Sequence, residues 1–152
     1  MDGLSAAASV TAVVQISGQV FGLCWEYYSK VKDARENIKR LRDELKFLED
    51  VVTNVEDLVD APGSAKLSIL GLLNQPDGPV QQCLKVLTQL AEKLKPEKGM
   101  DMRKFGSRAL QWPFISKDVD NVIAVIGRNK TTLSLALAGD QTYVEQFFPS
   151  LV

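Results

Sequence analysis

The chain of 152 residues contains no histidine and only two cysteines. Without histidine there is no Ser-His-Asp triad, no Cys-His pair and no zinc site that uses imidazole. Cys24 and Cys83 have apolar neighbours and no Cys-x-x-Cys spacing, which predicts buried free thiols in a reducing compartment. Glycine-rich phosphate loops are missing as well. We therefore expect a protein that is not an enzyme, with no catalytic residue, no metal ligand and no cofactor.

The chain also lacks an excess of charge of either sign, because 18 basic residues oppose 19 acidic ones. No global field attracts nucleic acid, so we expect no nucleic-acid partner. Basic residues gather only between Lys95 and Lys117, where methionines and aromatic residues are interleaved with them, a composition suited to anionic lipid headgroups. A solvated loop is the alternative. The predicted headgroup-binding residues are Lys95, Lys98, Arg103, Lys104 and Arg108.

No alternating apolar segment of useful length is present, so the pattern predicts an all-α protein. The clearest helix spans residues 33–60, where apolar residues follow steps of three and four. Ala61-Pro62-Gly63-Ser64 ends it, a short helix follows through Leu73, and Pro76-Asp77-Gly78-Pro79 is a turn into another helix. The last helix is expected to begin near Ser116 and stop at Gly139. We predict an antiparallel bundle of four to five helices over residues 1–140, with residues 141–152 as a linker or tail.

The first helix is hydrophobic and carries no charge from Gly3 to Trp25. Because the residues before it are acidic, we read it as part of the mature protein and not as a secretory signal. It spans about 34 Å, against roughly 30 Å of bilayer hydrocarbon. The predicted membrane-inserting residues contribute only about −2.4 to −4.8 kcal/mol together, which Gln15 and Gln19 oppose. These residues are Leu4, Val10, Val13, Val14, Ile16, Val20, Phe21 and Leu23.

Gly18 and Gly22 form a small-x-x-x-small pair on this helix. Small residues let helices approach closely in lipid, which favours a helix-contact role. They also let a central helix pack tightly inside a soluble bundle. The residues alone leave both interpretations open.

The chain resembles the HeLo-like domain found at the N-terminus of fungal STAND (NLR-like) receptors and cell-death effectors. The resemblance is carried by the start Met1-Asp2-Gly3-Leu4-Ser5, by Trp112-Pro113-Phe114 and by Lys130-Thr131-Thr132-Leu133-Ser134. It implies a cytoplasmic helical bundle, similar to the four-helix bundle of the mammalian necroptosis effector, that moves to the plasma membrane and triggers regulated cell death, as in heterokaryon incompatibility and innate immunity. It also implies self-association, driven by an activating receptor or signalling domain, with the first helix as the membrane-active element.

From these observations we expect a membrane-permeabilising domain whose first helix is packed inside at rest and is released when copies cluster. The alternative is a soluble protein-interaction or oligomerisation module whose first helix never leaves the core. A regulator of an attached enzyme domain is a third class, and no residue favours it.

Overall fold

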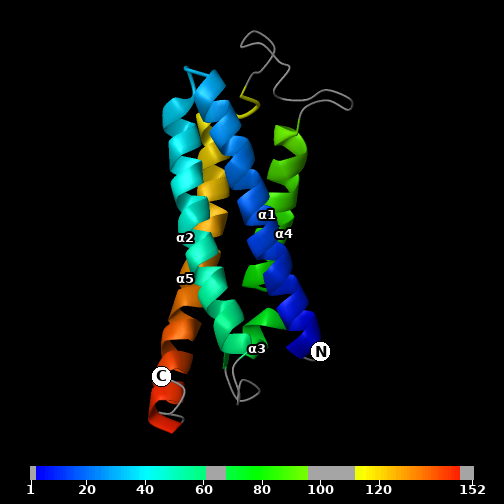
Figure 1. Cartoon of the computed structure of the whole chain (residues 1–152), viewed down its shortest axis with the longest axis vertical. Helices are drawn as coiled ribbons and strands as arrows, with labels where there is room; N and C mark the ends of the chain where they lie inside the picture. Colours follow the sequence, from blue (N-terminus) through cyan, green and yellow to red (C-terminus); the bar gives the residue numbers. More distant parts are fainter. Residues whose placement is uncertain (1–2, 61–67, 96–111, 148–152) are drawn as a thin grey trace.

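The computed structural model describes residues 3–60, 68–95 and 112–147, and this part of the chain contains five helices and no strand (Figure 1). The predicted all-α fold is confirmed. The helices are α1 (Gly3–Lys30), α2 (Arg35–Val59), α3 (Ser68–Leu73), α4 (Pro79–Leu94) and α5 (Ser116–Phe147). The predicted start of α3, at Ser64, lies outside the described residues.

Four long helices form the bundle, and α3 lies across one end of it (Figure 1). Helix α1 packs against α2 and α4, and α5 packs against the same two helices. Consecutive long helices alternate in direction, as expected, and α2 and α4 lie diagonally opposite each other in the bundle (Figure 1). Two of the packed pairs therefore run parallel, namely α1 with α4 and α2 with α5. The α2–α5 register is visible in hydrogen bonds from Asn37 to Ser116 and from Arg40 to Asp120, each about 80 residues apart in sequence.

The core is built on the apolar seam that the sequence predicts for α2. All of its members are buried, because a repeat of three and four residues keeps them on one face of the helix. They are Ile38, Leu41, Leu45, Leu48, Val52, Val55 and Val59. The facing seam of α1 is made of smaller side chains except at its last position, and consists of Val10, Val13, Ser17, Val20, Cys24 and Tyr27.

The turn before α4 requires glycine for reasons of space. A Cβ atom at Gly78 would lie 2.6 Å from the carbonyl oxygen of Leu72, which is too close for any side chain. The φ angle of Gly78 is −78°, so its backbone conformation is open to any residue. Gly78 therefore lets α3 and α4 approach each other.

Helix α5 continues past Gly139, so the predicted stop there is wrong. A glycine ends a helix when the chain turns into the left-handed region after it, and here the next residue is held in the helix by tertiary contacts. Asp140 is buried, and its carboxylate accepts a hydrogen bond of 2.8 Å from the backbone N–H of Ile69 in α3. Gly139 itself faces open space.

The two glycines give opposite predictions for alanine substitution. Gly78→Ala forces the α3–α4 turn apart and is expected to lower the free energy of unfolding by about 1–3 kcal/mol. Gly139→Ala, in an exposed helix, is expected to raise it by about 0.5–1 kcal/mol. Urea unfolding followed by circular dichroism measures both, and equal effects from the two variants would contradict the close approach at Gly78.

Candidate functional site

Helix α1 lies at one corner of the bundle, with one face toward solvent (Figure 1). Of the eight predicted membrane-inserting residues, the side chain of Leu4 lies outside the described part. Val10, Val13 and Val20 are fully buried. Val14, Ile16 and Leu23 are partly buried and pack against the core. Phe21 is partly buried as well, and its ring centroid lies 5.9 Å from the guanidinium of Arg42. Six of the seven described residues therefore face or flank the bundle core at rest.

The outer face of α1 is uncharged but not strongly apolar. Its exposed residues are Ala8, Thr11, Gln15, Gly18, Gln19, Gly22, Trp25 and Ser29. A Cβ atom at Gly18 or Gly22 would meet nothing within 4 Å. The two glycines therefore do no packing within this bundle, which decides against the tight-packing interpretation. Helix α1 therefore packs against the bundle with one face and exposes the other, as each member of a four-helix bundle does.

The buried seam of α1 contains a polar group without a partner. Ser17 is 0% exposed, and its hydroxyl makes no hydrogen bond. A buried hydroxyl that lacks a partner costs about 1–3 kcal/mol. With valines and a cysteine elsewhere in the seam, α1 buries less apolar side-chain surface per turn than the leucine-rich α2 does.

By length and composition, residues Ala7–Lys30 of α1 are sufficient to cross a membrane. The best window has a mean hydropathy of 1.4, and 28% of it is buried. A core helix of a soluble protein, which is mostly buried, and a signal sequence near the N-terminus pass the same test. Helix α1 therefore has the composition of a membrane span and the burial of a surface helix.

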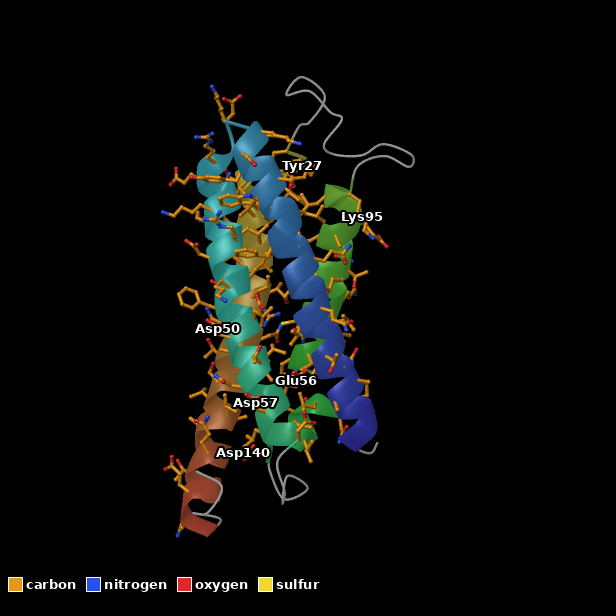
Figure 2. All side chains as sticks on the ribbon, in the orientation of Figure 1. Tyr27, Asp50, Glu56, Asp57, Lys95 and Asp140 are labelled. Atoms are coloured by element: carbon orange, nitrogen blue, oxygen red, sulfur yellow. The ribbon has the colours of Figure 1, made fainter. Side chains whose placement is uncertain are left out.

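Of the predicted headgroup-binding residues, only Lys95 lies in the described part; it is exposed just beyond the end of α4. Lys98, Arg103, Lys104 and Arg108 lie outside the described residues. Lys95 is at the end of the bundle where α1 finishes, since the hydroxyl of Tyr27 donates a hydrogen bond to the carbonyl oxygen of Leu94 (Figure 2). The amino end of α1 is at the opposite end. Lys95 therefore lies near the carboxyl end of α1, and the amino end of the predicted membrane helix lies the length of the bundle away from it.

Beside the carboxyl end of α1 lies a cluster that the sequence reasoning missed. We call it the aromatic–arginine patch, formed by Phe21, Trp25 and Tyr28 of α1 with Arg35 and Arg42 of α2. Trp25 and Tyr28 stack with ring centroids 6.1 Å apart. The guanidinium of Arg42 lies 5.2 Å from the centroids of both Trp25 and Tyr28, within the range of cation–π attraction. The only sign of it in the sequence is that the aromatic residues at the end of the first helix are followed, after a short connection, by the basic start of the second.

Further polar contacts join α5 to α2 and α4. The Lys130 ammonium lies 2.8 Å from the Glu44 carboxylate, and both side chains are largely buried. Glu44 of α2 therefore faces α5. Asn129 is 4% exposed and donates to the side chain of Gln82 and to the carbonyl of Val125.

A groove of about 250 Å³ runs between α4 and α5. Its lining combines four aliphatic side chains and Phe114 with the polar residues Gln89, Lys93, Asp118 and Asn121. No nucleophile paired with a base is among the lining residues. Within the described parts of the chain, no group of three or more acidic or cysteine side chains is placed to hold a metal ion.

Both cysteines are free and buried, as predicted. Burial raises the pKa of the Cys24 thiol to about 12, although the nearby charge of Arg42 opposes the shift. Burial likewise raises the pKa of Cys83 to about 12, against a hydrogen bond from Asn129. A thiol with such a pKa stays protonated at neutral pH and is a poor nucleophile.

The fold and the site define a class of protein: an all-α bundle domain with an uncharged, membrane-length first helix at one corner. The family described as Pigment biosynthesis cluster protein PigL N-terminal matches residues 1–145, and the chain belongs to this family. No curated protein and no solved structure matches the chain. The family match does not by itself identify a HeLo-like domain, which is a more specific assignment.

The buried thiols predict a loss of stability at high pH. Below pH 9 both thiols are protonated in the folded and unfolded chain and add no pH dependence. Between pH 9 and about 12 they ionise only in the unfolded chain, so the free energy of unfolding falls by up to about 1.4 kcal/mol per pH unit for each thiol. Denaturant unfolding at pH 8 and pH 10 measures the fall. The matched control, Cys24→Ala with Cys83→Ala, should show a shallower decline, and an identical decline would contradict the assignment.

Proposed function

We propose that this domain is a non-enzymatic, membrane-targeting module whose helix α1 is the membrane-active element. One observation carries the proposal: α1 is uncharged from Gly3 to Trp25 and is long enough to span a bilayer, yet it is only partly buried at a corner of the bundle. A helix of this kind is nearly balanced between a protein surface and a lipid environment.

The contacts of α1 are consistent with a resting state in which α1 packs on the bundle, and with its release by a small change in free energy. Its apolar residues face the bundle, so the free domain remains folded in water. Its seam is made largely of small side chains and includes the unsatisfied hydroxyl of Ser17, which weakens its hold relative to a seam of leucines. Clustering of several copies at a membrane supplies the bias, because a ligand or surface that favours the released state shifts the population toward it.

The HeLo-like resemblance extends the proposal to a biological outcome. In this view the protein is cytoplasmic at rest and moves to the plasma membrane when a receptor or signalling domain clusters it. Permeabilisation of anionic membranes would then trigger regulated cell death. The resemblance also assigns the N-terminal helix the leading role, in agreement with the physical character of α1.

A second candidate is a soluble oligomerisation module that uses the outer face of α1 without lipid. The specific observation in its favour is the open space around Gly18 and Gly22, which allows another helix to approach closely. Under this alternative α1 stays packed against α2 and α4 in every state.

Charges on the outer face of α1 separate the two candidates. Gln15→Glu with Gln19→Glu places two carboxylates at exposed positions, so the bundle keeps its fold. Each charge costs about 2.5–3.5 kcal/mol at the centre of a membrane-spanning helix, so dye leakage from anionic vesicles should fall by at least tenfold. Leakage assays with the natural chain and the variant measure this loss, with circular dichroism and melting as checks of folding.

The matched control is Gln89→Glu with Gln141→Glu, which makes the same change at exposed positions of α4 and α5. It has the same net charge, so it should retain leakage near the natural level. If both double variants leak as much dye as the natural chain does, α1 is removed from the mechanism and the soluble module is favoured. An equal loss in both would show that net charge, and not insertion of α1, controls leakage.

A further inference from the structure

The charges of the described residues are unevenly distributed along the bundle. After Lys46, helix α2 carries only acidic charges, and after Lys130 the same is true of α5. Both helices run toward the end of the bundle where α1 begins, and Figure 2 shows Glu56, Asp57 and Asp140 toward that end. We call it the acidic end, and it comprises Glu56, Asp57, Asp60, Asp77, Asp140 and Glu145.

The opposite end holds most of the basic residues, so we call it the basic end. Its basic residues are Lys30, Lys32, Arg35, Lys39, Arg40, Arg42, Lys93, Lys95 and Lys117. Acidic residues are present there too, namely Glu26, Asp33, Glu36, Asp43, Glu92, Asp118 and Asp120. Glu26 lies 3.5 Å from Lys30 and Asp120 lies 2.6 Å from Arg40, and each of these pairs cancels one charge of either sign. The basic end thus keeps a small excess of positive charge, whereas the acidic end is strongly negative, although the whole chain is nearly neutral.

The aromatic–arginine patch lies at the basic end and has the chemistry of a membrane interface. Tryptophan and tyrosine prefer the headgroup level of a bilayer, where an apolar ring and a polar edge are both accommodated. Trp25 is 53% exposed, although a large aromatic side chain on a soluble domain is usually better covered. The patch thus presents an exposed anchor without any movement of α1.

The arginines of the patch remain able to bind phosphate. Arg42 lies over the rings of Trp25 and Tyr28, and Arg35 lies 5.3 Å from the ring centroid of Tyr28. A cation–π contact does not use the hydrogen-bond donors of a guanidinium, so its N–H groups can still donate to phosphate oxygens. The contacts with the rings also favour positions of the two arginines beside the exposed aromatic side chains.

We propose that the domain docks on anionic bilayers through the aromatic–arginine patch, with the basic end toward the lipid and the acidic end away from it. A negative surface potential attracts the basic end and repels the acidic end, so it orients the bundle. Because the amino end of α1 lies at the acidic end, α1 meets the bilayer with its carboxyl end first. This inference rests on the proposed membrane function and adds the docking face and the direction in which α1 approaches.

Tryptophan fluorescence tests the orientation. Trp112→Phe leaves Trp25 as the sole tryptophan at the basic end, and the full chain is mixed with phosphatidylserine vesicles that contain brominated acyl chains. We expect the emission of Trp25 to shift to shorter wavelength and to be quenched. In a chain with Trp25→Phe and Trp112→Phe, Leu135→Trp provides a reporter farther along α5, because Leu135 is 70% exposed. Because Trp25 belongs to the patch, its emission is read only from protein that has sedimented with the vesicles. In that fraction the reporter should remain unquenched.

The outcomes separate the two proposals. Quenching of the Leu135→Trp reporter without quenching of Trp25, in a protein that still sediments with the vesicles, would overturn the docking face and leave the membrane function standing. A natural chain that fails to sediment with anionic vesicles would overturn both.

Substitution of the arginines gives a quantitative check. Arg35→Gln with Arg42→Gln should weaken binding to phosphatidylserine vesicles by about 30-fold, since each basic residue near an anionic surface contributes roughly fivefold. The matched control, Lys85→Gln with Arg128→Gln, removes the same charge at exposed positions away from the patch and should change binding much less. Equal losses in the two variants would show that net charge alone drives binding and would overturn the patch as the docking face.

Discussion

Seven apolar side chains of α2 pack between α1 on one side and α5 on the other, and the rest of the bundle is arranged around that seam. Leucines and isoleucine dominate its first half, where α5 joins it through Asn37, Arg40 and Glu44. The packing of this seam holds α2 and α5 parallel and leaves α1 to close the corner between α2 and α4. Because α2 is covered from both sides, α1 cannot move without exposing part of the core.

Helix α1 is therefore needed to cover the core, although its own buried seam packs with small side chains. Its buried seam fits against α2 with valines and a cysteine and includes the unsatisfied hydroxyl of Ser17, while its outer face carries no charge over most of its length. A surface helix of a soluble domain normally carries charges on its outer face. The departure from this pattern is confined to the helix that also has the length and hydropathy of a membrane span.

The separation of charge between the two ends of the bundle is apparent only in the folded structure. In sequence, acids and bases are mixed over the first half of α2, and only acids follow Lys46. In the fold, the basic start of α2 lies beside the aromatic end of α1 and the end of α4, whereas the acidic end of α2 lies beside that of α5. A nearly neutral chain thereby has two ends of different charge, and the aromatic–arginine patch marks the basic one.

The sequence by itself determined the helices and the buried face of α2, because a repeat of three and four residues depends only on the geometry of one helix. It also determined the buried thiols and the uncharged first helix. Tertiary structure alone decided that Gly18 and Gly22 face solvent, that α5 passes Gly139, and that Arg42 meets Trp25 and Tyr28. These features depend on which helices are neighbours and in which register they pack. The diagonal placement of α2 and α4 decides which helices are neighbours, and no local pattern in the sequence predicts it.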